Sequence, residues 1–213
     1  IGNALVDVLA HTDDGFLARN GVEKGIMQLI DRGRAVELYG HMGPAREISG
    51  GSAANTIAGL AALGARTAYV GKVKDDQLGA IFAHDLRAQG AKYSTPPAPS
   101  GHAAETGRCM VMVSPDGERS MSTYLGVSEF LAPDDIDEAD MAAAEWIFLE
   151  GYRFDGPDSI AAFEKAIRAT RAAGGRVAVT LSDPFCVERH RDEFLRMIAA
   201  DVDLLVANEH ELA

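Results

Sequence analysis

Residues 49–90 constrain the fold of this chain more than any other stretch of the sequence. They combine a Ser-Gly-Gly-Ser turn, a first helical pattern, a short apolar strand at 67–70 and a second helical pattern that ends at Gly90. We expect Ser52 to cap the first helix and Gly64 to end it, because these residue types favour those positions. A turn-helix-strand-helix unit of this kind is typical of three-layer α/β proteins.

The last third of the sequence repeats this alternation. Apolar runs at 146–149, 176–181 and 204–207 predict strands, and the segments 158–173 and 187–200 between them predict helices. Strands and helices of these lengths form right-handed βαβ crossovers, so we expect a mostly parallel sheet.

Polar residues follow these strands at the point where each strand ends. Glu150, Ser182-Asp183 and the segment 208–211 each come directly after a strand. Taken singly, each is more often an ordinary cap or loop group. Because open α/β sheets bind ligands along the carboxyl edge, the group as a whole predicts a site there.

Two segments do not fit a parallel sheet. Residues 13–48 consist of short polar and apolar pieces separated by glycines, and they predict a small peripheral sheet. Residues 108–113 and 118–124 are joined by a Ser-Pro-Asp-Gly turn and predict a β-hairpin, which suggests an inserted lid. Arg119, just past the turn, is a candidate ligand residue, although a charged residue at such a place is usually only solvated.

Asp7 interrupts the apolar strand expected at 4–9. A carboxylate in such a strand is costly unless it is paired or meets a ligand, so Asp7 is a candidate hydroxyl-binding group. The sequence leaves open the alternative that Asp7 is bonded to neighbouring backbone at the end of the strand.

The composition limits the classes of partner. With 213 residues, of which 47% are hydrophobic, the chain can bury the core of one α/β domain. The net charge of −12 argues against nucleic acids and anionic membranes, although a small phosphate group can still bind locally. No apolar run reaches the roughly 18 residues of a membrane span and no basic leader opens the sequence, so we expect a cytoplasmic protein.

Other cofactor and metal motifs are missing from the sequence. It contains neither a P-loop nor a G-x-G-x-x-G turn after a strand. Cys109 and Cys186 have no partner at metal-ligand spacing, so we expect two buried thiols. The six histidines are scattered and are interpreted as surface or structural residues. Both ends of the sequence look interrupted, and we expect it to be part of a longer protein.

Two motifs resemble the first signature of the ribokinase-like (PfkB) carbohydrate and nucleoside kinases. They are SGGSAANT at 49–56 and GKVKDDQLG at 71–79. The early DDGFL run at 13–17 and the Gly-Gly-Ser form of the turn are more similar to the adenosine kinase branch than to ribokinase. Three further segments extend the resemblance over nearly the whole chain: 2–7, 105–107 and 208–211.

This resemblance implies a ribokinase-like three-layer α/β/α domain with a mostly parallel sheet and a small β-sheet lid, inserted at about 9–48 and 105–127. It implies transfer of the γ-phosphoryl group of ATP to a primary hydroxyl of a nucleoside, with adenosine as the first choice. The alternatives are a PfkB sugar kinase acting on ribose, fructose or an acidic sugar, and a non-catalytic sugar- or nucleoside-binding relative. A homodimer through the lid is a further expectation.

The resemblance also assigns roles by position. Asn208 and Glu211 match the N-x-x-E motif that organises Mg²⁺ around the phosphates of ATP, Glu211 through water. Glu150 matches a sugar-binding Glu that adenosine kinases often lack. Together with Arg119 from the hairpin, the candidate acceptor-binding residues are Asn3, Asp7, Gly50, Gly51, Ser52, Asn55, Arg119 and Glu150.

The second signature of that family does not occur in the chain. This Asp-Thr-x-Gly-Ala-Gly-Asp loop supplies the anion hole and the catalytic Asp, and we expect it beyond Ala213. The chain would therefore hold the acceptor half of the site, without the C-terminal ATP-binding part. We expect a protein of these residues alone not to turn over ATP.

Overall fold

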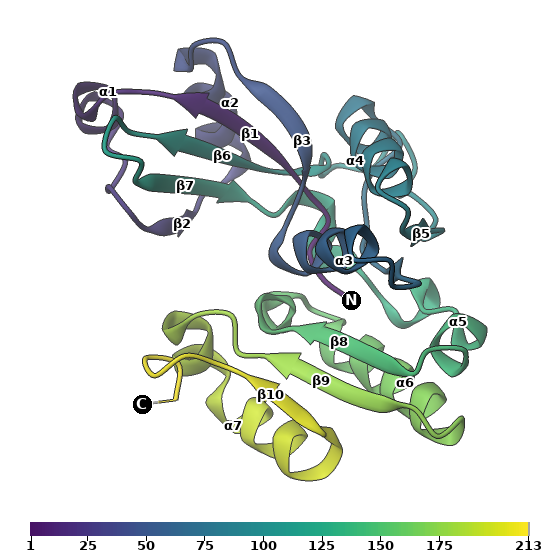
Figure 1. Cartoon of the computed structure of the whole chain (residues 1–213). Coiled ribbons are helices and arrows are strands. Elements are labelled where there is room, and N and C mark those ends of the chain that lie inside the picture. The colour runs from purple at the N-terminus through teal and green to yellow at the C-terminus, as the bar shows by residue number, and fades with distance from the viewer. Residues whose placement is uncertain (213) are drawn as a thin grey trace.

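The computed structural model describes residues 1–212 and contains a mixed five-stranded sheet beside a parallel sheet (Figure 1). The strands of the mixed sheet lie in the order β2-β7-β6-β1-β3. Strand β1 pairs with β6 in parallel and with β3 antiparallel, and β6 and β7 form an antiparallel hairpin. The five strands are β1 (Leu5–His11), β2 (Met27–Leu29), β3 (Arg46–Gly50), β6 (Gly107–Val113) and β7 (Arg119–Tyr124).

The parallel sheet is completed by the first residues of the chain. The nitrogen of Ile1 donates to the Phe148 carbonyl at 2.7 Å, Glu150 N–H donates to Ile1 at 3.1 Å, and Gly2 N–H donates to Val70 at 3.0 Å. Residues 1–2 thus join two sets of parallel strands into one sheet. One set has the order β10-β9-β8, and the other is the pair β4-β5. Their bounds are β4 (Ala68–Tyr69), β5 (Lys92–Tyr93), β8 (Trp146–Glu150), β9 (Arg176–Thr180) and β10 (Leu204–Val206).

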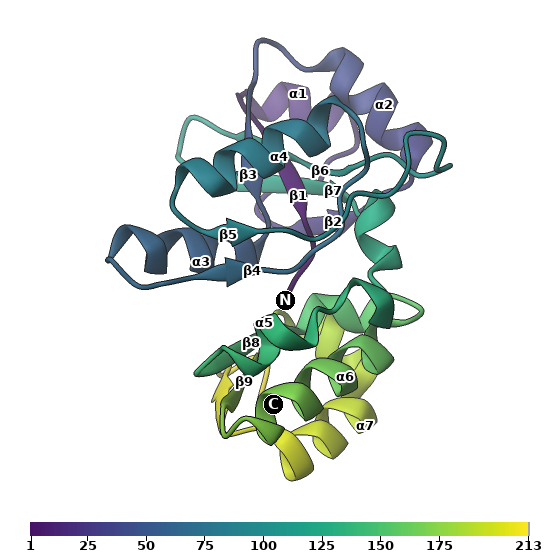
Figure 2. The same ribbon diagram turned by 90° about the vertical axis from the view of Figure 1, so that its right-hand side faces the viewer.

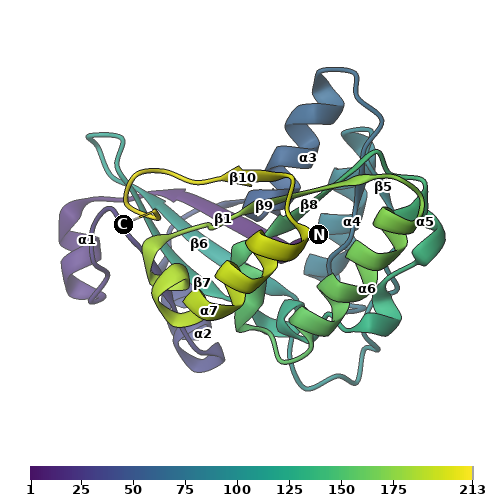
Figure 3. The same ribbon diagram turned by 90° about the horizontal axis from the view of Figure 1, so that it is seen from below.

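Helices cover both sheets. Helices α6 and α7 run along one side of β8, β9 and β10 (Figures 1 and 3), where Phe154, Phe163 and Phe194 pack together. Helices α3 and α4 lie with β1, β3, β4 and β5 (Figure 2). The helices are α1 (Asp14–Arg19), α2 (Arg32–His41), α3 (Ser52–Ala62), α4 (Gln77–Ala88), α5 (Glu138–Ala142), α6 (Ser159–Ala172) and α7 (Pro184–Asp201), with 3₁₀ turns at Gly126–Phe130, Pro133–Asp135 and Gly151–Asp155.

Most of the expected elements are present. The hairpin, the helix that ends near Gly90 and the alternating strands and helices of the last third all occur close to their expected bounds. Gly64 follows α3 with φ of 87°, and Cys109 and Cys186 are buried free thiols. No helix within residues 1–212 is long and apolar enough to cross a membrane.

Residues 13–48 differ from the sequence-based expectation. They contribute β2 and β3 to the five-stranded sheet, but they also form α1 and α2. The carboxylates of Asp13 and Asp31 accept hydrogen bonds from Phe16 N–H and Arg34 N–H and so start these helices. Because of such a cap, α2 forms although it contains two glycines.

The prediction that Ser52 is the N-cap of α3 is wrong. The residue at the N-cap of α3 is Gly51, and Ser52 is the first helical residue. Its hydroxyl donates to the Glu150 carboxylate instead of accepting from the backbone of its own helix. A side chain 98 positions away therefore takes over the capping that sequence pattern assigned to Ser52.

Asp76 fastens α4 to the start of β6. Its carboxylate accepts from Gly79 N–H at 2.8 Å, which caps the helix, and from the Thr106 N–H at 3.0 Å and hydroxyl at 2.6 Å. The Thr106 hydroxyl in turn accepts from Lys74 N–H at 2.9 Å. One side chain thus holds the helix and the entry into the hairpin in a fixed relation.

Replacing Asp76 by Ala removes a cap and leaves buried donors unpaired, so we expect it to lower the free energy of unfolding by about 2–4 kcal/mol. Asp75→Ala is the matched control, because Asp75 is exposed and only its backbone is hydrogen-bonded among the described residues; it should change stability by less than about 0.5 kcal/mol. Urea unfolding measures both. Equal effects of the two substitutions would show that Asp76 acts only as a surface residue.

Candidate functional site

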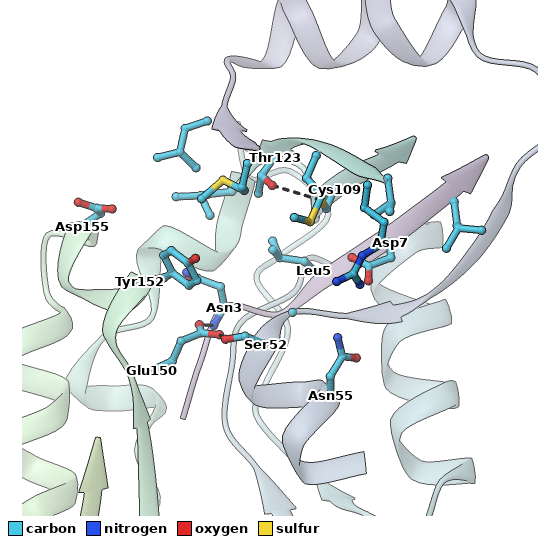
Figure 4. A pocket seen from close by; sticks show the side chains of 18 of the residues that line it. Asn3, Leu5, Asp7, Ser52, Asn55, Cys109, Thr123, Glu150, Tyr152 and Asp155 are labelled. Carbon is cyan, nitrogen blue, oxygen red and sulfur yellow. Dashed lines mark hydrogen bonds between the residues drawn. The ribbon is translucent and has the colours of Figure 1, made fainter. Parts of the chain in front are cut away.

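A cavity of about 310 Å³ lies between the five-stranded sheet and the carboxyl end of β8 (Figure 4). Its apolar wall comes from the strands of the mixed sheet and the residue that follows β7: Leu5, Leu9, Met27, Leu29, Val111, Met121 and Leu125. All of the predicted acceptor-binding residues except Gly50 line it: Asn3, Asp7, Gly51, Ser52, Asn55, Arg119 and Glu150. The structure therefore brings together residues that are far apart in the sequence.

Asp7 is the polar group at the sheet side of the cavity. It lies on β1 between Ile48 of β3 and Cys109 of β6. Burial raises the pKa of its carboxyl to about 6, while the charge of Arg119 acts in the opposite direction. Because its carboxylate accepts no hydrogen bond from residues 1–212 in this structure, both oxygens are available to a ligand.

Gly50 and Gly51 allow the turn before α3 to come close to this carboxylate. A Cβ atom on Gly50 would lie 2.2 Å from the carboxyl carbon of Asp7. Gly51 has φ of 96°, and a Cβ atom there would lie 2.5 Å from the Asn3 carbonyl oxygen. The turn places Asn55 in the first turn of α3, with its side chain directed toward the cavity (Figure 4).

Glu150 forms the floor of the cavity and is 1% exposed. One oxygen accepts from Asn3 N–H at 2.6 Å, and the other accepts from Ala53 N–H at 3.0 Å and from the Ser52 hydroxyl. Ser52 and Ala53 are the first residues of α3, and a carboxylate at the N-terminus of a helix is stabilised by the helix dipole. Glu150 thus ties β8, α3 and the first residues together, and direct contact with a ligand stays a prediction.

The sequence analysis did not name the third side of the cavity. Tyr152, Asp155 and Arg189 line it. Asp155 accepts from Arg189 at 2.8 and 3.1 Å and contacts the His190 ring nitrogen at 2.7 Å. For Tyr152 and Asp155 the only available signal was their place just after β8, at the carboxyl edge that sequence pattern had identified. Arg189 lies within α7, and no local pattern marked it.

Asn208 and Glu211 lie outside this cavity. The Asn208 amide donates to Glu211 at 2.8 Å and its oxygen accepts from Glu211 N–H at 3.0 Å. Glu211 borders a second hollow, of about 570 Å³, beside α7 and β10. No group of three or more His, Cys, Asp or Glu side chains in the described part of the chain is arranged to hold a metal ion. One carboxylate acting through water is compatible with Mg²⁺ held mainly by phosphates, so their role stays a prediction.

Several known proteins are similar to this chain in sequence and in fold. The ATP-dependent ribose-1-phosphate kinase of Halopiger xanaduensis is 35% identical over 169 residues, which are 79% of this chain and 52% of that protein. The crystal structure of adenosine kinase from Sinorhizobium meliloti has a TM-score of 0.92 and 51% identity, over 99% of this chain and 64% of that one. A probable sugar kinase from Rhizobium etli CFN 42 has a TM-score of 0.91 and 47% identity, over 99% and 63%.

These similarities confirm the predicted fold class, a mixed α/β fold with a mostly parallel central sheet. The chain spans about half the length of the curated relatives that it matches. The family described as pfkB family carbohydrate kinase matches residues 26–213. This range includes most of the residues that line the cavity and both motifs of the first signature, at 49–56 and 71–79. By this match and by its fold, the chain belongs to the PfkB kinase family.

Proposed function

We propose that the protein represented by this chain transfers the γ-phosphoryl group of ATP to a primary hydroxyl of a nucleoside, with adenosine as the first choice. The family supports a phosphotransferase. The observation that favours a nucleoside over a free sugar is the predominance of apolar side chains on the sheet side of the cavity, beside a few polar groups such as Asp7.

The polar end suits a sugar ring. Asp7 provides a carboxylate free to accept from two hydroxyls, and Asn55 and Gly51 line the same cavity at the start of α3. The apolar wall suits a flat aromatic base, because most of the side chains on that side, Met27 and Met121 among them, are apolar. A free sugar would cover only the polar end and leave the apolar wall in contact with water.

ATP and Mg²⁺ are proposed as cosubstrate and cofactor. Mg²⁺ would supply charge neutralisation on the transferred phosphoryl group. Asn208 and Glu211 are the residues of this chain proposed to organise it. The residues of the cavity orient the acceptor and exclude water from it, which accounts for a large part of catalysis in phosphoryl transfer.

Adenosine should bind to this chain roughly tenfold to hundredfold more tightly than ribose or fructose, because only the nucleoside buries the apolar wall. Isothermal titration calorimetry with each ligand measures the ratio. Tighter binding of either sugar would favour the sugar kinase alternative, and no binding of any of them would contradict the proposed site.

The 213-residue chain should bind adenosine without phosphorylating it, because the predicted general base and phosphate loop are not among its residues. A coupled assay for ADP release, with adenosine and Mg-ATP, tests this expectation. ADP formed in an adenosine-dependent manner by these residues alone would show that the catalytic groups are already present in the chain.

Asp7→Asn should weaken adenosine binding by about 2–4 kcal/mol, since it removes an ionised acceptor of hydroxyl hydrogen bonds. The same substitution should raise the stability of the folded chain at neutral pH. The pKa of Asp7 is raised from 3.8 to about 6 in the folded chain, so ionised Asp7 destabilises the fold at neutral pH and this penalty disappears below pH ~4. The melting temperature of Asp7→Asn should therefore exceed that of the wild type at pH 7.5, by a margin that shrinks toward pH 4.5.

The matched control for Asp7 is Asp134→Asn, an exposed site away from the cavity. It should leave both binding and melting temperature unchanged. If Asp7→Asn binds adenosine as the wild type does, Asp7 is a structural residue, and the alternative left open by the sequence is correct.

A further inference from the structure

Arg153 is the largest fully buried side chain of the described residues, with 1% of its surface exposed. It lies in the 3₁₀ turn after β8, close to the floor of the cavity. Its guanidinium donates to the Asn3 side-chain oxygen at 3.0 Å, to the carbonyls of Ser128 and Leu131 and to the Ser159 hydroxyl.

This charge is buried without a direct counter-ion. No carboxylate oxygen of residues 1–212 lies within 4.0 Å of Arg153, and its Nε has no hydrogen-bond partner. Burial lowers the pKa of the guanidinium, and the charge of Glu150 opposes this effect. Burying an arginine in this way is costly, and an apolar side chain could fill the same space. The arrangement therefore calls for a role beyond packing.

Asn3 lies between these two buried charges. Its backbone N–H donates to Glu150, and its side-chain oxygen accepts from Arg153. A guanidinium has only donors, so it fixes the amide oxygen of Asn3 on the Arg153 side and its NH₂ group on the opposite side. That NH₂ group has no acceptor among the described residues, and Asn3 lines the cavity.

We propose that Arg153 is a positioning residue, which holds the Asn3 amide with its NH₂ group toward the cavity and thereby selects ligands that present a hydrogen-bond acceptor at that point. This inference rests on the proposed function and adds a donor to a site in which Asp7 is the acceptor. The matching ligand atom is an unprotonated ring nitrogen or an ether, hydroxyl or carbonyl oxygen. A ligand with only donors at this position leaves the Asn3 NH₂ group unpaired.

Asn3→Asp reverses the polarity of the group in the cavity. It keeps an oxygen toward Arg153 and replaces the donor in the cavity by an acceptor, so the fold should retain its melting temperature while adenosine affinity falls at least about tenfold. Gln28→Glu is the control, because it adds the same charge on β2 at a residue that does not line the cavity; it should leave affinity unchanged. A folded Asn3→Asp chain that binds adenosine as the wild type does would overturn the proposal.

Amide NMR spectra of ¹⁵N-labelled chain test the orientation directly. In the wild type the side-chain NH₂ of Asn3 should give one pair of signals, which shifts on addition of adenosine. Arg153→Met should move that pair toward the chemical shifts of an unconstrained amide, since the side chain is then free to turn, and Arg153→Lys should keep it close to the wild-type shifts.

Unchanged Asn3 signals in a folded Arg153→Met chain would show that Arg153 only stabilises the surrounding loops. If Arg153→Met does not fold, the binding result for Asn3→Asp decides. If the wild type binds no nucleoside, the proposed function fails, whereas the ligand-free signals of Asn3 in Arg153→Met and the wild type still decide for or against the fixed orientation.

Discussion

The carboxylate of Glu150 is the interaction on which the site depends. It accepts hydrogen bonds from the first residues of the chain and from the start of α3, and it follows directly on β8. A buried carboxylate is stable only when such donors surround it, and the positive end of α3 adds to their effect. The same bonds fix Asn3 and the turn at Gly51, so the geometry of the cavity floor and that of the sheet are set together.

The cavity lies where the chain passes from one sheet to the other. Residues 1–2 belong to the parallel sheet, and β1 continues from them into the mixed sheet beside β3 and β6. Asn3 and Asp7 therefore stand on one continuous segment, at the edge of one sheet and on the face of the other. This explains why polar residues for a ligand and an apolar wall meet in one place.

The sequence predicted local structure well where short-range chemistry decides it. The Pro-Asp-Gly turn predicted the hairpin, and the helical spacing of apolar residues predicted α4 and α6. The prediction failed where the hydrogen-bond partner of a residue is distant in the sequence. Ser52 is a residue type that favours the N-cap position, but Glu150 takes that role. The apolar wall escaped detection because β1 and β6 are mostly buried on both faces, which hides the alternation expected of a half-buried strand. Arg189 joins the site only through tertiary packing, and no local pattern marks it.

The placement of residues 1–2 at the centre of the parallel sheet has a consequence for how the chain folds. Their partner β8 lies 147 positions further along, so the ribosome releases residues 1–2 long before β8 exists. Closing so long a loop carries an entropic cost that only the completed sheet repays, and contacts of such high sequence separation slow the folding reaction. The parallel sheet can reach its final form only after β8 has been synthesised, and until then the edges that residues 1–2 will fill stay open to association with other strands.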